Sequence, residues 1–177
     1  TFYHPRFHDD DLPSSREGLC ASYAEKLDTI VGIFALGIKP SGDKDPFGLR
    51  RSSTGLIRIL VEGEVDIDLL KTINMALANF DVKVNTEELV SLIQKFILER
   101  FKSYLLEKNI DIQISKCVLS NPSYSVCNKY KQACALQNFY ANKELSTIIK
   151  GQKRIKNILK KNKYKVNSEF DVNLCRE

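Results

Sequence analysis

Residues 89–105 read Leu-Val-Ser-Leu-Ile-Gln-Lys-Phe-Ile-Leu-Glu-Arg-Phe-Lys-Ser-Tyr-Leu, and their apolar side chains recur three or four positions apart. This spacing predicts an amphipathic α-helix, because a helix turns once in about 3.6 residues. Asn85 and Glu88 precede the run in the arrangement of a capping box, which indicates where a helix begins. The face expected in the core consists of Leu89, Leu92, Ile93, Phe96, Ile97, Phe101, Tyr104 and Leu105.

Three helices are expected before this one. The first starts near Ser15, and Gly37 with Pro40 marks its end. Asp45 and Pro46 predict the start of the second, with the aspartate as N-cap and the proline at the first helical position; it runs to Gly63. Asp66 is expected to cap the third. The apolar faces comprise Tyr23, Leu27, Ile30, Val31 and Phe34; Leu49, Leu56, Ile57 and Leu60; and Leu69, Leu70, Ile73, Leu77 and Phe80.

Further helices are expected after residue 109. Short ones span residues 112–119 and 123–136, and the last covers about 143–161, with Gly151 as a weak point inside it. The alternation typical of a strand occurs only at residues 110–114. We therefore expect an all-α chain, folded as one helical bundle or as two small helical subdomains with a soft boundary near Asn109.

Composition predicts a soluble, cytoplasmic protein without a membrane span. Hydrophobic residues make up 43% of the 177 residues, enough for an ordinary core. No apolar run approaches the roughly 20 residues that cross a bilayer. The five scattered cysteines suit reduced thiols. Cys127 and Cys134 share a helix face, but no further ligands accompany them, so a metal site is not expected.

Basic side chains gather toward the C-terminal end. Nine lysines and arginines between residues 143 and 165 are opposed only by Glu144. Such a strip favours a polyanionic partner, since lysines neutralise phosphates without reading bases. A solvated helix face is the alternative. Tyr140 and Tyr164 bracket the strip and are placed either to stack on unpaired bases or to pack at helix ends. The candidate contacts are Lys150, Lys153, Arg154, Lys156, Lys160 and Lys161.

The most specific stretch is residues 25–51, which read Glu-Lys-Leu-Asp-Thr-Ile-Val-Gly-Ile-Phe-Ala-Leu-Gly-Ile-Lys-Pro-Ser-Gly-Asp-Lys-Asp-Pro-Phe-Gly-Leu-Arg-Arg. This run resembles a signature of the β subunit of bacterial two-subunit glycyl-tRNA synthetase. Segments that fall in the family's order flank it: residues 3–7, 11–13, 58–62, 98–101 and 153–159. The resemblance covers most of the chain. Because the family's β chain is several times longer, an excised middle portion is expected.

The resemblance implies a role in joining glycine to its tRNA. The α subunits of the family use ATP and magnesium for the chemistry, whereas the β subunits grip the tRNA, in an assembly of two α and two β chains. Residues 1–108 would hold the end of an HD-like helical domain with the helices that follow it. Residues 109–177 would form a helical linker into the anticodon-binding region. We expect no catalytic residue, metal or cofactor in this chain itself.

The signature loop, residues 39–46, combines glycine, lysines and a helix start, as phosphate-binding turns do. It lacks the Walker spacing, and Asp43 and Asp45 would repel a nucleotide phosphate. The loop is therefore either a rigid interhelical turn or a contact for the RNA backbone or the α subunit. The contact residues under the second hypothesis are Lys39, Lys44, Arg50 and Arg51. Among Arg50, Arg51 and Arg58, one is expected to be paired inside and another to face RNA.

Hydrolytic activity is not expected. His8-Asp9 is the dipeptide that names the HD metal-phosphohydrolases, but both histidines of this chain lie in one loop, whereas several ligands must converge on a catalytic metal. Active members carry Ala-Asp-Lys where this chain has Ala24-Glu25-Lys26. A Ser-His-Asp or Cys-His site is excluded by the same shortage of histidine. The alternative to tRNA recognition is a scaffold that docks the α subunit and spaces the other β domains.

Overall fold

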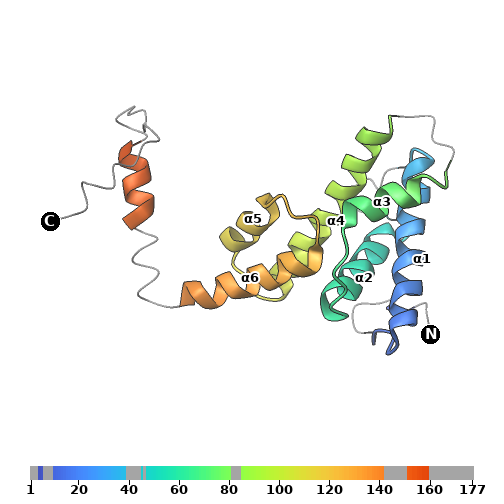
Figure 1. The fold of residues 1–177 in the computed structure, drawn as a ribbon, viewed down its shortest axis with the longest axis horizontal. Helices are drawn as coiled ribbons and strands as arrows, with labels where there is room; N and C mark the ends of the chain where they lie inside the picture. The colour runs from blue at the N-terminus through green and yellow to red at the C-terminus, as the bar shows by residue number, and fades with distance from the viewer. Residues whose placement is uncertain are drawn as a thin grey trace, which may run out of the picture. The chain divides into compact units, whose positions relative to one another are not determined.

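The computed structural model describes residues 4–5, 10–38, 45, 47–80, 85–141 and 151–159. Contacts divide the chain into two units, Thr1–Gln137 and Asn138–Glu177. Within the described residues there is no strand, only an isolated bridge between Asp68 and Ser125, so the all-α prediction is confirmed. The named helices are α1 (Arg16–Ala35), α2 (Leu49–Glu62), α3 (Leu69–Leu77), α4 (Thr86–Glu107), α5 (Ile112–Ser120) and α6 (Val126–Ala141) (Figure 1).

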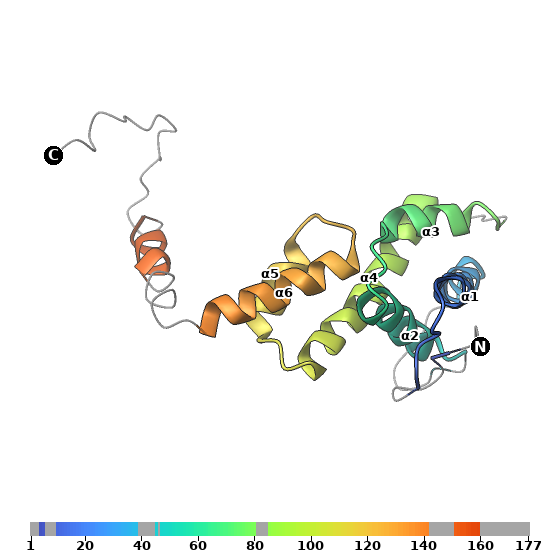
Figure 2. The same ribbon diagram turned by 60° about the horizontal axis from the view of Figure 1, so that its bottom comes forward.

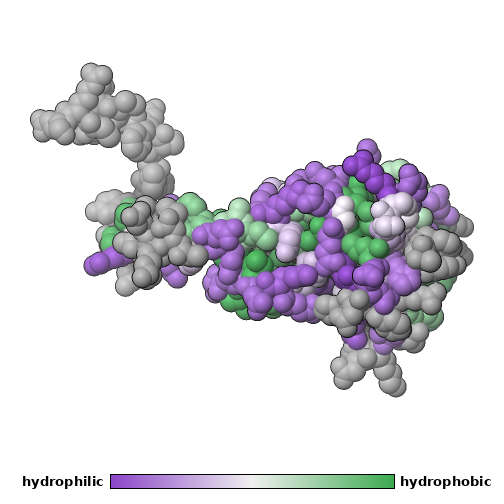
Figure 3. All heavy atoms as spheres, turned by 90° about the horizontal axis from the view of Figure 1, so that it is seen from below, coloured by the Kyte–Doolittle hydropathy of each residue, from purple (hydrophilic) through white to green (hydrophobic). Residues whose placement is uncertain are grey.

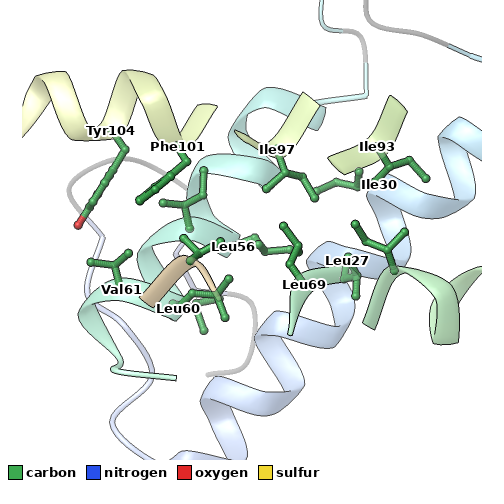
Figure 4. Close-up of a cluster of buried hydrophobic side chains, with 14 of the residues drawn as sticks. Leu27, Ile30, Leu56, Leu60, Val61, Leu69, Ile93, Ile97, Phe101 and Tyr104 are labelled. Carbon is green, nitrogen blue, oxygen red and sulfur yellow. The ribbon is translucent and has the colours of Figure 1, made fainter. Parts of the chain in front are cut away.

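One hydrophobic core holds the first unit together. Side chains of α1, α2, α3 and α4 meet in it, as the close-up in Figure 4 shows for Leu27, Leu56 and Ile97. The predicted face of α4 is confirmed, since its residues are buried except Leu92 and Phe96, which pack half-buried against the core. Burial of this kind contributes about 25 cal/mol for each Å² of apolar surface removed from water.

Helices α1 and α2 are antiparallel neighbours (Figure 2). A Cβ on Gly63 would lie 3.2 and 3.3 Å from the two methyl groups of Leu19, and one on Gly55 would lie 2.8 Å from Cε of Lys26. Moving forward along α1 therefore means moving backward along α2. The end of α1 and the start of α2 consequently lie at the same end of the pair, on either side of the signature loop.

Of the helix starts expected at Ser15, Asp66 and Asn85, the first and the last are confirmed and the one at Asp66 is wrong. Ser15 Oγ accepts a hydrogen bond from Gly18 N at 3.0 Å, and Asn85 caps α4 by accepting from Glu87 N. Helix α3, however, is capped by Asp68, whose carboxylate accepts from Lys71 N at 2.9 Å. Asp66 instead accepts hydrogen bonds from Ser125 Oγ and Asn128 Nδ2 on the α6 side.

The segments after residue 109 follow the predicted order. Residues 112–114, in the short alternating stretch, belong to α5 rather than to a strand. Helix α6 begins at Val126, three residues later than expected, and continues to Ala141. Of the last expected helix, residues 151–159 are helical and the remainder lies outside the described residues. No described helix is long and apolar enough to cross a membrane.

The functional division into residues 1–108 and 109–177 stays a prediction. Asn109 lies within the first unit, at the turn between α4 and α5, where its φ is 61°. On the face of the first unit seen in Figure 3, hydrophilic side chains surround smaller apolar areas. Surfaces that contact a partner therefore have to be identified from individual residues.

Candidate nucleic-acid interface

The start of α2 is organised by Asp45. Its carboxylate accepts hydrogen bonds from Leu49 N at 2.8 Å and Arg50 N at 2.9 Å. The helix itself begins at Leu49 after Gly48, later than the predicted start at Pro46. Asp45 therefore caps α2 as expected, but from three residues before the N-cap position. Two of the amide groups that this helix start could offer to an anion are thus taken up by the Asp45 carboxylate.

Arg51 lies over the turn that leads into α2. Gly48 has a φ of 64°, a conformation that residues with a side chain rarely adopt. A Cβ on Gly48 would lie 3.1 Å from a terminal guanidinium nitrogen of Arg51. Glycine at this position therefore permits both the turn and the close approach of the Arg51 side chain, which is exposed.

Arg58 is the arginine that is paired inside. Its residue is 9% exposed, and both Nε and a terminal nitrogen lie 3.0 Å from Glu62 Oε2. Arg50 is half-buried and Arg51 is exposed. Of these three arginines, Arg51 is consequently the one whose charge is most open to a polyanion.

Glu62 is the centre of a network that the sequence analysis missed. Besides Arg58, it accepts a hydrogen bond from the Tyr104 hydroxyl at 3.0 Å and lies 3.3 Å from Lys108 Nζ. Burial alone would raise the pKa of Glu62, but the hydrogen bonds from Arg58, Tyr104 and Lys108 lower it. Burial and the neighbouring Glu62 carboxylate raise the pKa of Tyr104, so its hydroxyl stays protonated and donates. The network ties α2 to α4.

Two buried lysines were also missed. Lys129 is 2% exposed, and its Nζ donates to the carbonyls of Val118 at 3.0 Å and Asn121 at 2.6 Å, at the end of α5. Burial lowers the pKa of this amine. Lys26, in the signature, is buried where its stem passes Gly55. A glycine inside an otherwise apolar helix was the available signal for such a close approach.

The described part of the basic strip is an exposed helix. Lys153, Arg154 and Lys156 are all exposed, and no ion pair to any of them occurs among the described residues. The apolar residues of the same helix, Ile155, Ile158 and Leu159, are exposed as well. Tyr140, near the end of α6, is 51% exposed.

Several candidate residues lie outside the described part of the chain. They include the loop lysines, half of the basic strip, the second flanking tyrosine and the His-Asp pair: Lys39, Lys44, Lys150, Lys160, Lys161, Tyr164, His8 and Asp9. Their roles stay predictions.

The net charge is divided unequally between the two units. Residues 138–177 hold 10 of the 27 lysines and arginines but only 4 of the 22 aspartates and glutamates. The first 137 residues therefore hold 17 basic and 18 acidic side chains, which nearly cancel. The net positive charge of the chain thus belongs to the second unit.

The described residues contain no group of three or more His, Cys, Asp and Glu that could hold a metal ion. Cys127 is buried, and burial raises the pKa of its thiol. Cys134, which lies about two turns further along the same face of α6, is half-buried. Cys127 and Cys134 are both free thiols.

Comparison with known proteins places the chain among aminoacyl-tRNA synthetase subunits. Residues 1–120 match the family model described as "Glycyl-tRNA synthetase beta subunit". The chain belongs to this family. Curated relatives named glycine–tRNA ligase β subunit include that of Chromohalobacter salexigens, which is 33% identical over 174 residues, covering 98% of this chain and 25% of the relative.

Two further relatives carry the same name. That of Coxiella burnetii is 36% identical over 159 residues, covering 90% of this chain and 23% of the relative. That of Colwellia psychrerythraea is 34% identical over 175 residues, covering 99% and 25%. The chain therefore spans about a quarter of the length of the curated relatives it matches.

Proposed function

We propose that this chain is a tRNA-recognition segment of the glycyl-tRNA synthetase β subunit and carries no reaction centre of its own. It contributes to the ligation of glycine to its tRNA by holding the RNA backbone. The contacts are phosphate clamps: Lys39, Lys44, Arg50 and Arg51 around the signature loop, and Lys150, Lys153, Arg154, Lys156, Lys160 and Lys161 in the basic strip.

The observation that carries this proposal is the division of charge. All the net positive charge lies in residues 138–177, and the described helix there exposes Lys153, Arg154 and Lys156 without an ion pair to any described residue. Cations that neighbouring carboxylates neutralise have little to offer a polyanion, whereas cations without such a partner release counterions from the nucleic acid when they bind its phosphates. Family membership supplies the identity of the polyanion.

The remaining parts of the enzyme complete the reaction in this proposal. The α subunit binds ATP and magnesium and carries out the chemistry, in a cytoplasmic assembly of two α and two β subunits.

Fluorescence anisotropy tests the proposal directly. The chain is titrated with glycine tRNA, a non-cognate tRNA and a DNA duplex over a series of salt concentrations. We expect binding that prefers tRNA and weakens steeply with salt. In the K153E/R154E variant, the slope of log affinity against log salt should fall by about 1.5, because each lost phosphate contact removes about 0.7 to 0.9.

A matched control separates local contacts from a general change of charge. Lys71 on α3 and Lys116 on α5 are both exposed, so K71E/K116E alters the net charge equally without touching the basic strip. This control should keep most of the wild-type affinity. Equal losses in the two double variants, or no binding by the wild type even at low salt, would reject the clamp.

One observation favours a second function, a scaffold that docks the α subunit. Ile155, Ile158 and Leu159 expose one apolar face of the short helix, and exposed apolar faces often contact proteins. Under this function K153E/R154E leaves tRNA binding unchanged. I155S/I158S weakens association with the α subunit, which analytical ultracentrifugation of the two subunits measures.

A further inference from the structure

Three large apolar side chains are exposed around the signature loop. Leu36 and Ile38, at the end of α1, are 74% and 38% exposed, and Phe47, just before α2, is 47% exposed. Single exposed apolar residues are ordinary, but several within one short region indicate a contact surface.

The antiparallel arrangement places these residues at one end of the helix pair. Leu19 lies beside Gly63, and Lys26 lies beside Gly55. Because the two helices are antiparallel, the end of α1 at Ala35 and the start of α2 at Leu49 lie at the same end of the pair. Leu36 and Ile38, which follow α1, and Phe47, which precedes α2, therefore lie toward that end.

The guanidinium of Arg51 lies close to Gly48, the residue that follows Phe47 in the chain. Arg51 is folded back over the turn so that one of its terminal nitrogens approaches the position of a Cβ on Gly48, the residue after Phe47. Two amides at the helix start, those of Leu49 and Arg50, already donate to Asp45. Recognition at this turn consequently depends on two side chains, an exposed aromatic ring and an exposed guanidinium.

We propose that Phe47 and Arg51 hold an unpaired nucleotide of the bound RNA. This inference rests on the proposed function and specifies which part of the RNA this surface takes. The ring stacks on the base, and the guanidinium contacts a neighbouring phosphate. A base in a duplex has both faces covered by its neighbours, so only a single-stranded end or loop offers a face to Phe47.

The guanidinium is the reason for choosing a nucleotide over an apolar protein surface. An apolar partner that covered Phe47 and the turn at Gly48 would also cover the Arg51 guanidinium and leave its charge without water or a counterion, which is costly. A nucleotide supplies both an aromatic face and an anion. Leu36 and Ile38 then border the base and exclude water from the stack.

Binding of two RNAs of identical sequence tests the inference. One is a single strand that contains 2-aminopurine, whose fluorescence is quenched by stacking, and the other is the same strand in a duplex. F47L should weaken binding of the single strand about 5-fold to 100-fold and abolish the added quenching, as expected for one lost stack. Affinity for the duplex should change less than about twofold.

A matched control is available in Phe139 on α6, which is also 47% exposed. F139L should bind both RNAs as the wild type does. R51K retains the charge but loses the planar fork, and should weaken only single-strand binding. Since Phe47 is exposed and precedes the helix, F47L should keep the wild-type melting temperature, which circular dichroism verifies.

The outcomes separate this inference from the function on which it rests. If the wild type binds both RNAs with a steep salt dependence and F47L does so equally, the nucleotide site is rejected and the phosphate clamp stands. If F47L weakens association with the α subunit while RNA binding is unchanged, the surface is a protein interface and the inference is wrong. If the wild type binds neither RNA, both proposals are rejected.

Discussion

The hydroxyl of Tyr104 on α4 donates a hydrogen bond of 3.0 Å to Glu62 at the end of α2, across 42 residues of sequence. The same carboxylate pairs with Arg58 from its own helix and with Lys108 from the end of α4. Glu62 therefore links α2 to α4 by polar contacts, in addition to the apolar contacts between the two helices. Its surroundings lead to two predictions about stability.

Replacing Tyr104 by phenylalanine should destabilise the first unit by about 1 to 2 kcal/mol. The ring remains in place, but the carboxylate loses a donor, and hydrogen bonds to charged groups contribute on this scale. Urea denaturation followed by circular dichroism measures the change. Tyr124 is exposed, so Y124F serves as the control and should unfold as the wild type does. A Y104F variant that unfolds at the same urea concentration as Y124F would contradict the prediction.

The stability of the first unit should fall with acidification partly through Glu62. Since the folded-state pKa of Glu62 lies below the ordinary value of 4.5, its ionised carboxylate stabilises the folded chain above pH 4.5. This contribution is lost as the pH drops through the lowered pKa. E62Q should thus be less stable than the wild type at pH 7, and the difference should shrink below pH 4.5.

Thermal melts between pH 2.5 and 7 check this prediction. E64Q changes an exposed carboxylate two residues further along the chain, and its melting temperature should run parallel to that of the wild type. A constant difference between E62Q and wild type at every pH would mean that the carboxylate acts through packing and not through its charge.

A comparison of two glycines that both have a positive φ tests how closely the Arg51 side chain approaches the turn at Gly48. Gly37 has a φ of 78° with nothing within 4 Å of an added Cβ, whereas Gly48 has a φ of 64° and the Arg51 guanidinium at 3.1 Å. Both alanine variants should lose about 1 to 2 kcal/mol, the usual cost of the left-handed conformation. G48A should lose more unless Arg51 moves.

The double variant G48A/R51A isolates that contact. Removing the guanidinium should return the cost of G48A to that of G37A, as a double-mutant cycle by denaturant unfolding can show. If G48A and G37A cost the same and R51A has no influence on either, the side chain of Arg51 does not occupy the turn in solution.

Burial of Lys129 predicts an unreactive amine. Acetylation of the native chain with an N-hydroxysuccinimide ester should modify the exposed Lys131 on the order of tenfold or more faster than Lys129, because Lys129 reacts only when α6 opens locally. Mass spectrometry of tryptic peptides gives the two rates. Similar rates in the native chain would be incompatible with an amine held by the carbonyls of Val118 and Asn121, and denatured protein provides the reference.

Local periodicity was sufficient to predict most of the helices. The apolar face of α4, the helix start near Ser15 and the cap at Asn85 depend on residues within one or two turns of each other, and all were predicted correctly. The start of α3 was not, because Asp66 and Asp68 are equivalent on local grounds. Ser125 and Asn128, which engage Asp66, come from 59 and 62 residues further along the chain.

The candidate interface was predictable only in part for a similar reason. The exposure of Lys153, Arg154 and Lys156 follows from the basic composition of their own segment. The burial of Arg58 depends on the contacts that its partner Glu62 makes with Tyr104 and Lys108 of α4 and its C-cap. No local sequence pattern reveals those two contacts. Lys129 likewise reads as a surface residue until the end of α5 is placed beside it.

The unequal division of charge has a kinetic consequence. Long-range attraction raises association rates and is screened beyond about 10 Å at 0.1 M salt, whereas stacking acts only on contact. Residues 138–177, which hold the net positive charge, would therefore govern how fast RNA is captured. Phe47 and Arg51 would govern how long it stays bound, so substitutions in the two places should separate the association rate from the residence time.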